Sequence, residues 1–478
     1  MKHIYTKAAL CAALALSVST AVAKVPESEA ARLGQDLTPM GSERAGNASG
    51  TIPEWTGGLS GTANVPGYTE GSHLTDPFPN EQPLFVITAA NVDQYADKLS
   101  PGQVALFKKY PDTYTMPVYP THRTVALPDD VIAKVRQNAV TSELVNDGNG
   151  VVNFEVAHAF PIPQNVYEVL WNHLTRYRGG SAQRTYVQVP VQASGAFVPV
   201  GITDTFTWPD FLVGGKDPVK DRNVLIYFTY AINSPPQLTG TVLLVHETVD
   251  QNTDQRRAWL YNAGQRRVRR APQVAYDGPG QGSDGTRTAD DFDMFNGAPD
   301  RYDWKLVGKK EMYVPYNSYR LHSPDLTYDQ IHMKGHMNQD YTRYELHRVY
   351  EVEATLKEGS RHIYAKRVFY IDEDSWQILA MEKDLRLEFI PVTPDGLLDI
   401  DAYRELLMLG PKVVAFAQMS NVLGTITPAK EIIDLAHQAG AITVVDGAQS
   451  VPHIPVDVQD LDIDFLAFSA HKMLGPTG

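Results

Sequence analysis

The stretch RYELHRVYEVEATL, residues 343–356, decides the fold of the larger part of this chain. Apolar and polar side chains alternate along it, and in a β-strand successive side chains point to opposite faces of the sheet. The sequence therefore predicts a half-buried antiparallel strand. One face would carry Glu345, His347, Glu351 and Glu353, and the other Tyr344, Leu346, Tyr350, Val352, Ala354 and Leu356.

Similar alternating segments recur between about residues 150 and 385, separated by turn residues. KEGS at 357–360 and NAGQ at 262–265 each separate two such segments and favour hairpins. The pattern predicts a large, curved antiparallel sheet. Aromatic residues on these strands suit a packed core, which is the commoner case, or the wall of a hydrophobic cavity. They are Trp259, Tyr261, Tyr344, Tyr350, Phe369 and Trp376.

The chain before this block has a different texture. Residues 24–82 are rich in Gly, Pro, Ser and Thr, which favours an extended arm with turns over regular structure. A helical patch is predicted next, with Asn91 as a cap of one helix and Pro101 as the start of another.

The first 23 residues, MKHIYTKAALCAALALSVSTAVA, have the features of a secretory signal peptide. Lys2 and Lys7 precede an apolar run that is too short to span a bilayer, and a small-x-small site predicts cleavage after Ala23. The single cysteine, Cys11, lies inside this segment, so the mature chain would hold no thiol. The formal charge of −14 would become −16, which disfavours nucleic acid as a partner. No other run approaches membrane-spanning length.

Past about residue 386 the sequence changes to buried runs alternating with an amphipathic helix. VVAFAQMSN and ITVVDGAQS are apolar runs that end in polar residues, and TPAKEIIDLAHQAG between them has helical periodicity closed by Gly440. Strands that alternate with helices and end in functional residues are typical of a parallel α/β sheet.

Three further features have both a structural and a functional interpretation. His332 and His336 stand four apart, but Gly335 between them argues against a helical metal site, and no metal is predicted. GPGQGSDG at 278–285 is favoured as a plain loop over a phosphate loop. RRVRR at 266–270 is favoured as a solvated strand face over a site for anionic headgroups.

Several stretches between about residues 33 and 383 carry a family resemblance, among them LTPMGSERAGNASGTIPEWTGG, VLLVHETVDQ, YNAGQRRVRRAP and FNGAPDRYDWKLVGKKEMYVPYN. This block resembles a Gram-negative family catalogued as domain of unknown function 1329. Its members are often labelled outer-membrane lipoprotein-sorting-like, and the hairpins resemble the LolA/LolB fold, an incomplete antiparallel barrel around a hydrophobic cavity. The resemblance implies a periplasmic protein without a cofactor that binds a lipid or another hydrophobic small molecule. An envelope transport system is its candidate partner.

The segment from about residue 387 to 478 resembles SufS-like group II cysteine desulfurases of the class V aminotransferase family. The resemblance rests on FIPVTPDGLLDIDAYRELL and on the run from VVAFAQMSN to FSAHKMLGPTG. It implies a pyridoxal 5'-phosphate site, in which an amine forms the imine and a carboxylate keeps the ring nitrogen protonated. By resemblance, Lys472 forms the Schiff base, Asp446 pairs with the pyridinium nitrogen, Gln449 contacts the ring hydroxyl, Ser469 and His471 hold the phosphate, and Asn421 faces cofactor and substrate.

This second resemblance covers only a middle piece of the desulfurase pattern. The upstream phosphate loop and the stacking histidine have no counterpart here, nor do the downstream reactive cysteine loop and small domain. An isolated piece of a large sheet would also leave strand edges unpaired. We therefore expect the tail to be inactive as an enzyme.

The two resemblances together indicate a chimera of an exported protein and a fragment of a cytoplasmic enzyme. The expected function is periplasmic binding or trafficking of a hydrophobic ligand or lipid, and the alternative is a PLP-dependent cysteine desulfurase. The expected fold is mainly β, followed by an α/β fragment of a fold-type I aminotransferase domain. The predicted parts are a signal peptide at 1–23, an extended arm at 24–82, a β-rich domain truncated at its C-terminus at 83–385, and the PLP-enzyme fragment at 386–478.

Overall fold

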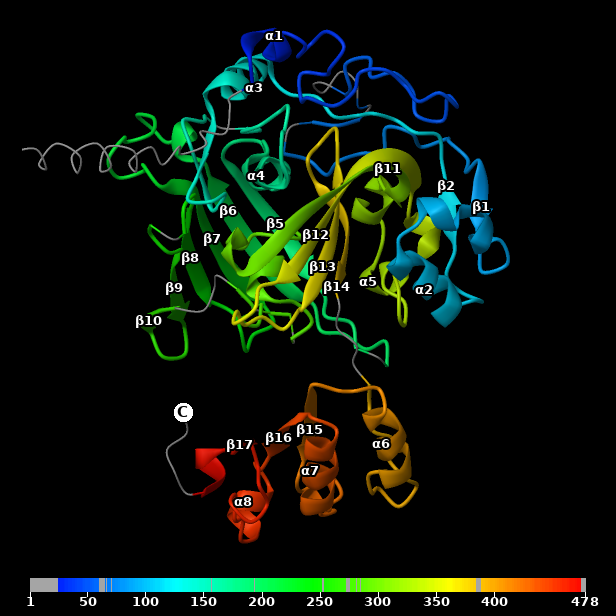
Figure 1. Cartoon of the computed structure of the whole chain (residues 1–478), viewed down its shortest axis with the longest axis vertical. Helices are drawn as coiled ribbons and strands as arrows, with labels where there is room; N and C mark the ends of the chain where they lie inside the picture. Colours follow the sequence, from blue (N-terminus) through cyan, green and yellow to red (C-terminus); the bar gives the residue numbers. More distant parts are fainter. Residues whose placement is uncertain are drawn as a thin grey trace, which may run out of the picture. The chain divides into compact units, whose positions relative to one another are not determined.

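The chain divides into two compact units, residues 1–384 and 385–478 (Figure 1). The predicted signal peptide and Cys11 lie outside the described residues. Within the described residues, no helix is long and apolar enough to cross a membrane. The computed structural model describes residues 25–59, 65, 67–69, 71–155, 157–192, 194–251, 253–271, 276–280, 282–283, 285–383 and 388–473.

The first sheet of the first unit is built around β12 (Tyr344–Leu356), the alternating stretch for which an antiparallel strand is predicted. β11 pairs antiparallel with β12 along nearly its whole length, and β13 pairs with the C-terminal half of β12. β2 joins β12 through a parallel pairing at Tyr344. The other strands of this sheet are β1 (Phe85–Ile87), β2 (Met116–Val118), β11 (Tyr302–Pro315), β13 (Lys366–Asp372) and β14 (Ile378–Lys383).

The prediction that β12 is half-buried is wrong for its N-terminal half, because its polar face is covered too. Glu345 is 0% exposed and His347 is 1% exposed. The Glu345 carboxylate accepts hydrogen bonds from the backbone N–H of His122 at 2.8 Å, from the Asn317 amide at 3.0 Å and from the Arg343 guanidinium at 2.6 Å. A buried charge is tolerated when it is paired in this way.

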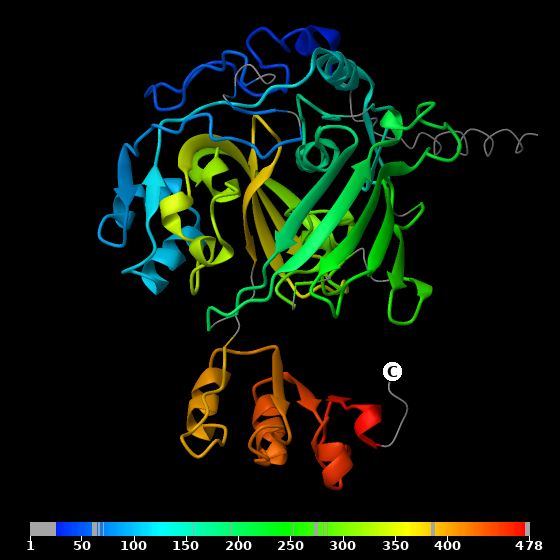
Figure 2. The ribbon, with the colours of Figure 1, turned by 180° about the vertical axis from the view of Figure 1, so that it is seen from behind.

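The second sheet is an antiparallel meander of six strands in the order β10-β9-β8-β7-β6-β5 (Figure 2). Its end strands are not paired with each other, so the described sheet is not a closed barrel. The mainly antiparallel fold is confirmed, but the strands belong to two sheets rather than one. The predicted NAGQ hairpin joins β9 to β10, with Asn262 opposite Arg267. The strands are β5 (Ala182–Gln188), β6 (Val200–Thr207), β7 (Val224–Ser234), β8 (Val242–Thr248), β9 (Arg257–Asn262) and β10 (Arg267–Arg270).

Helix α4 (Val166–Thr175) connects the cores of the two sheets. Its buried Leu170 and Trp171 belong to one apolar cluster with Phe206 of the second sheet and Phe369 of the first. The remaining helices and the small hairpin are α1 (Glu27–Ala30), η2 (Val92–Lys98), α2 (Pro101–Lys109), α3 (Asp129–Thr141), α5 (Tyr328–Ile331), η3 (Pro209–Phe211), η4 (Ala289–Asp291), η5 (Pro299–Arg301), η6 (Tyr319–His322), η7 (Gln339–Tyr341), β3 (Glu143–Val145) and β4 (Gly150–Val152).

The predicted start of a helix at Pro101 is correct, since α2 begins there with Ser100 and Gln103 forming a capping box. Asn91 precedes the 3-10 helix η2, but its side chain accepts from the backbone N–H of Thr88 at 2.7 Å instead of capping that helix.

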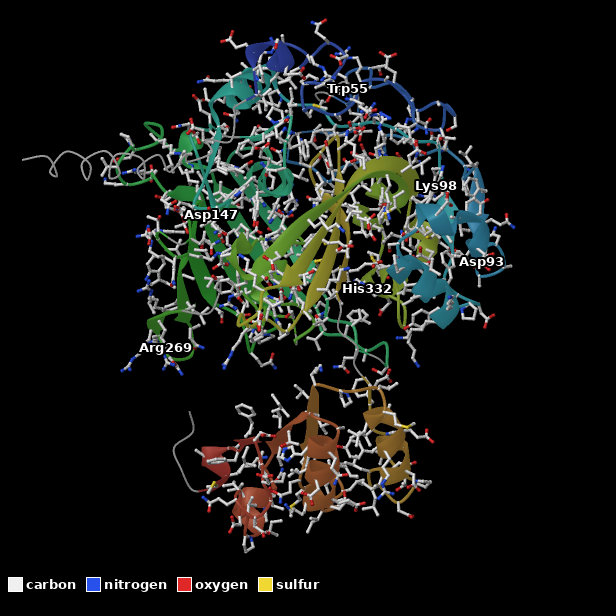
Figure 3. The ribbon with its side chains drawn as sticks, in the orientation of Figure 1. Trp55, Asp93, Lys98, Asp147, Arg269 and His332 are labelled. Atoms are coloured by element: carbon white, nitrogen blue, oxygen red, sulfur yellow. The ribbon has the colours of Figure 1, made fainter. Side chains whose placement is uncertain are left out.

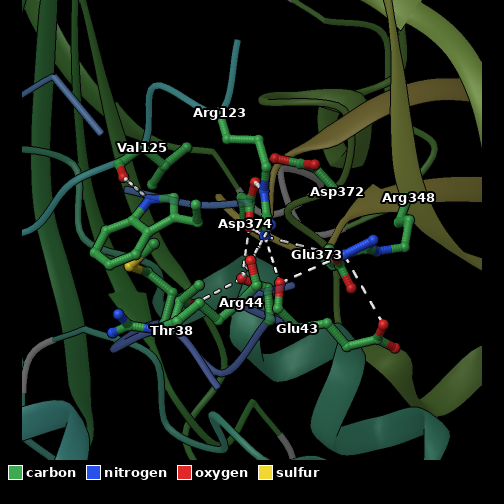
Figure 4. A network of polar contacts seen from close by, with 12 residues as sticks. Thr38, Glu43, Arg44, Arg123, Val125, Arg348, Asp372, Glu373 and Asp374 are labelled. Atoms are coloured by element: carbon green, nitrogen blue, oxygen red, sulfur yellow. Dashed lines mark hydrogen bonds and ion pairs between the residues drawn. The ribbon is translucent and has the colours of Figure 1, made fainter. Parts of the chain in front are cut away.

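The N-terminal arm is mostly irregular, as its composition predicts, and polar contacts fix it to the turn between β13 and β14 (Figure 4). The Ser42 hydroxyl donates to Asp374 at 2.5 Å, and the Trp376 indole donates to the Met40 carbonyl at 3.0 Å. Arg123 lies between them and donates to both Asp374 oxygens, at 2.6 and 2.8 Å. The arm is therefore part of the packed unit.

The second unit has the predicted α/β texture. Its three strands are parallel and pair in the order β15-β16-β17. Its core joins α6 and α7 to one face of the sheet through Tyr403, Ile432 and Val445. The elements are α6 (Ile400–Leu407), β15 (Val413–Ala417), α7 (Ala429–Gln438), β16 (Ile442–Asp446), α8 (Ser450–His453), β17 (Phe465–Ala467) and η8 (Ala470–Met473).

Candidate functional site

The candidate site is a cavity of 1670 Å³ in the first unit, on one face of the second sheet. Its lining includes both exposed residues, such as His73, and buried residues, such as Arg256. The volume exceeds the roughly 300–1,000 Å³ of common small-molecule pockets. The cavity therefore has room for a long or branched molecule.

The floor of the cavity follows directly from strand alternation. In β7 the lining residues are Ile226, Phe228 and Tyr230, every second residue, because alternate side chains point to the same face. Across the sheet these residues continue in cross-strand rows. Phe206, Phe228 and Val245 are neighbours in one row, and Tyr230, Leu243 and Leu260 are neighbours in the next. The floor is therefore largely apolar.

Charged side chains line one part of the cavity beside this floor. Arg176 and Arg178, which follow α4, both donate to the same carboxylate oxygen of Asp293, and the Arg178 distance is 2.6 Å. The Nε atom of Arg178 is buried and has no hydrogen-bond partner among the described residues. The guanidinium group of Arg178 also lies 5.9 Å from the ring centre of Phe206. The charged cluster and the apolar floor are thus adjacent.

A second ion pair borders this cluster. Arg256 donates from Nε to Glu247 at 2.6 Å, and its Nη2 donates to the carbonyl of Asn296. The Asn296 amide also donates to Glu247 at 3.2 Å. Glu247 is opposite Ile226 in the sheet, so this pair lies one row beyond Phe228 and Val245.

The electrostatics of the cluster favour negative charge. Burial raises the pKa of Asp293, but Arg176 and Arg178 outweigh it and lower that pKa to about 2. Burial lowers the pKa of Arg178 to about 10, and the positive charge of Arg176 acts in the same direction. Arg178 still carries its charge at neutral pH, but in surroundings where further anionic charge would be stabilising.

The aromatic residues singled out in the sequence do not line this cavity. Tyr344, Tyr350, Phe369 and Trp376 are buried in the cores, which is the commoner role of strand aromatics. Trp259 and Tyr261 lie on β9 and are half-buried. The lining residues Phe206, Phe228, Leu243 and the arginines of RYR at 176–178 were not predicted from the sequence. Alternation in the strands was a usable signal for the floor, but the pairing of Arg178 with Asp293 depends on long-range packing.

The histidine pair, the RRVRR segment and the GPGQGSDG segment lie in turns, strands and loops of the first unit. His332 and His336 flank a turn after α5; His336 Nε2 lies 2.9 Å from the Thr113 hydroxyl, and His332 packs against Phe197. No group of three or more metal-ligating side chains among the described residues is arranged to hold a metal. Figure 3 shows Arg269 of RRVRR on exposed β10. The described part of GPGQGSDG is a loop, and Pro279 and Gly280 line the cavity.

In the second unit, the residues implied by the desulfurase resemblance follow the carboxyl ends of the strands. Asn421 follows β15, Asp446 ends β16, Ser469 follows β17, and Lys472 lies in η8. Gln449 comes three residues after Asp446, and the His471 side chain lies outside the described part of the chain. Because the strands are parallel, their carboxyl ends lie at one edge of the sheet.

These residue types suit pyridoxal phosphate, but their surroundings do not enclose it. Asp446 is exposed, and one of its oxygens accepts the backbone N–H of Ala448 at 2.8 Å. The sheet face that carries Asp446 also exposes apolar residues, including Ile442 and Phe465, the latter 61% exposed. Parallel sheets normally bury both faces, and a cofactor site excludes water. The described fragment does not form such an enclosure, and we derive no catalytic step from it.

Comparison with known proteins gives two family matches, which overlap at residues 352–384. Residues 86–384 match a family described as "Protein of unknown function (DUF1329)", and residues 352–478 match "Aminotransferase class-V". The uncharacterized protein PA3922 of Pseudomonas aeruginosa is 58% identical over 367 residues, covering 76% of this chain and 80% of that protein. A cysteine desulfurase of Synechococcus elongatus is 50% identical over 123 residues, covering 26% of this chain but only 20% of that enzyme.

Among solved structures, a putative outer membrane lipoprotein-sorting protein domain from Vibrio parahaemolyticus overlaps 49% of this chain and 74% of its own, at 15% identity and a TM-score of 0.30. The family assignment rests on the sequence matches, which cover most of the first unit. The chain belongs to the DUF1329 family, and its C-terminal segment is a fragment of a class V aminotransferase.

Proposed function

We propose that the first unit binds a hydrophobic small molecule or lipid in the 1670 Å³ cavity, as a carrier of the lipoprotein-sorting type. The observation that carries the proposal is the apolar floor formed by alternate residues of β6 to β9. Transfer of each CH2 group from water to such a surface contributes about 0.8 kcal/mol. An alkyl chain would therefore bind without any catalytic group.

The test uses a pair of variants on one strand. Leu243 lines the cavity, whereas its neighbour Leu244 is on the opposite face of β8. In Leu243→Trp the indole would occupy cavity volume, and we expect the affinity for the dye 1-N-phenylnaphthylamine to fall about tenfold or more. Leu244→Trp adds the same group outside the cavity and should bind the dye like the unaltered protein.

Dye binding is measured by fluorescence titration, with 1-hexadecanol as a competitor. No saturable binding, or equal loss in both tryptophan variants, would count against the proposal. Circular dichroism of both variants shows whether the fold is retained.

We further propose that the protein is exported and acts in the periplasm. This rests on residues 1–23, whose charged start, apolar run and cleavage site have the pattern of a signal peptide. Mass spectrometry of the protein from a Gram-negative host should give an N-terminus at Lys24 in the osmotic-shock fraction. Recovery of the uncleaved chain in the cytoplasmic fraction would contradict the proposal.

For the second unit, we propose a remnant of a pyridoxal-phosphate site without desulfurase activity. The placement of Asp446, Ser469 and Lys472 after the carboxyl ends of parallel strands supports the site, and the exposed face beside Asp446 argues against turnover. With pyridoxal phosphate added, we expect the whole chain to release no more sulfur from L-cysteine than the Lys472→Ala variant does. Release of sulfur above the Lys472→Ala background would contradict this proposal.

A further inference from the structure

Five arginines line the cavity, and the carboxylates near them are fewer. In the described part of the chain, Glu247 and Asp293 line the cavity, and buried Asp204 pairs with Arg184 at 2.6 Å. Positive charge therefore exceeds negative charge around an otherwise apolar cavity. The lining arginines are Arg176, Arg178, Arg184, Arg256 and Arg287.

The excess is most pronounced where Arg176 and Arg178 share one oxygen of Asp293. One carboxylate cannot neutralise two guanidinium groups, and the buried Nε of Arg178 has no hydrogen-bond partner among the described residues. A buried donor without an acceptor is costly, and an arginine fork is well suited to an anionic oxygen pair. The Nε atom itself is closed off, but the Arg178 side chain as a whole is 24% exposed and lines the cavity, so its charge is within reach of an anionic group there.

The apolar part of the same ligand has a place directly beside this position. Arg178 lies over the Phe206 ring, and Phe206 begins the row that continues through Phe228 and Val245. From there the next row, with Tyr230 and Leu243, extends the apolar surface along the strands. A molecule with a charged head at Arg178 would therefore lay its tail along the floor.

We propose that the cavity takes a long-chain amphiphile with a single anionic head, carboxylate or phosphate, and that Arg178 and Arg176 hold the head while the rows of β6 to β8 hold the tail. The inference rests on the proposed binding function and deepens it by naming the class of ligand. Charge complementarity selects this occupant over a neutral hydrocarbon.

The test compares three probes with the same chain length on the whole protein. Hexadecanoate, hexadecyl phosphate and 1-hexadecanol, each below its micelle concentration, compete with 1-N-phenylnaphthylamine for the cavity. We expect at least one anionic probe to displace the dye at a concentration about tenfold or more below that of the alcohol. A preference for hexadecanoate would identify a carboxylate head, and a preference for hexadecyl phosphate a phosphate head.

The variant Arg178→Gln removes the charge and keeps much of the side-chain length. It should abolish the preference for the anion and leave the affinity for 1-hexadecanol within about twofold. Arg270→Gln makes the same change in net charge on the opposite face of the sheet, because Arg270 pairs with Trp259 and not with the cavity-lining Leu260. This variant should keep the preference.

Equal displacement by all three probes, or an anion preference that persists in Arg178→Gln, would overturn the inference while leaving hydrophobic binding intact. Failure of all three probes would overturn the binding function as well. If Arg178→Gln also loses the alcohol, Arg178→Lys decides: return of the anion preference supports the inference, and its continued absence overturns it.

Discussion

Buried ionic contacts around Asp374 fix the N-terminal arm to the first sheet (Figure 4). The side chains of Arg123 and Asp374 are 2% and 1% exposed, and their nearest atoms are 2.6 Å apart. Next to them, Arg348 and Lys309 both pair with Glu373, at 2.6 and 2.9 Å. Removal of one member would leave a charge without compensation in a site closed to water.

Arg123→Met should therefore destabilise the first unit by about 3–5 kcal/mol, because Asp374 would remain buried without its main partner. The free energy of unfolding is measured by urea titration with tryptophan fluorescence. The control is Lys366→Met in the same sheet, where the pair with Glu353 is partly exposed. Its loss should cost about 1 kcal/mol or less. Equal effects of the two substitutions would argue against the ionic contact as the cause.

Asp372 predicts a pH dependence of the opposite sign to that of most paired carboxylates. Burial, together with the negative charge of Asp374, raises its pKa to about 6. A group whose pKa is higher in the folded state gives stability that is complete below its unfolded pKa and is lost as pH rises through 6. The side chain in Asp372→Asn stays neutral. The free energy of unfolding of this variant, relative to that of the unaltered protein, should therefore rise by about 2–3 kcal/mol between pH 4 and 7.

Urea titrations of both proteins at several pH values check this prediction. The difference between the two free energies of unfolding is the quantity to follow, since other groups titrate in both proteins. A difference that does not change between pH 4 and 7 would show that Asp372 ionises normally. The Tyr316 hydroxyl, the Ser375 backbone N–H and the Ser375 hydroxyl all donate to one oxygen of Asp372, and an amide oxygen at this position is an acceptor as well.

At the residue scale, the sequence predicted which side chains alternate but not what covers them. Glu345 and His347 have the polar character of an exposed face, yet both are buried. The residues that compensate Glu345 include His122 and Asn317, which are far away in sequence. Such long-range pairing leaves no local periodic signal, so the polar network of β12 and the Arg178 cluster could not be predicted from pattern alone.

At the element scale, α4 packs into the core shared by both sheets and also positions the charged part of the cavity. Arg176, which lines the cavity, follows the helix directly. Asn165 caps the start of the helix, and its side chain accepts the backbone N–H of Glu168 at 3.1 Å. Nine of its ten residues are buried, and these include the polar residues Glu168, Asn172 and His173. The position of its last turn therefore sets where the two arginines lie.

Asn165→Ala should destabilise the first unit by about 1 kcal/mol, because the first turn of α4 loses its cap. Asn165→Ser keeps an acceptor oxygen and should recover at least half of that loss. Urea titration measures both, and identical values for the two variants would show that the cap contributes nothing.

Local elements were predictable where the signal is local. The NAGQ hairpin and the start of α2 at Pro101 follow from turn and capping chemistry within a few residues. The division of the strands into two sheets was not predicted, because the choice of partner strand depends on contacts distant in sequence. The pairing of β2 with β12, more than two hundred residues apart, is such a contact.

At the scale of the whole molecule, each unit has its own apolar core. Leu170 belongs to the main core of the first unit, and Ile432 belongs to the core of the second; both are 0% exposed. Because the two cores share no residue, each unit should unfold in its own transition.

Scanning calorimetry of the whole chain should show two transitions. Leu170→Ala is expected to lower the midpoint temperature of only one transition, and Ile432→Ala that of only the other. Each substitution should destabilise its own unit by the roughly 2–5 kcal/mol typical of a buried truncation. A single transition that both variants shift equally would show that the units unfold together.

The exposed arginine strand β10 also affects how copies of this chain meet one another. It is an end strand of its sheet, and such an edge offers unpaired backbone groups to which another chain can add a strand. All four residues of β10, Arg267–Arg270, are exposed, and three of them are arginines. Two such edges brought together would place like charges opposite each other, so electrostatic repulsion keeps the sheet from growing by self-association, most strongly at low ionic strength.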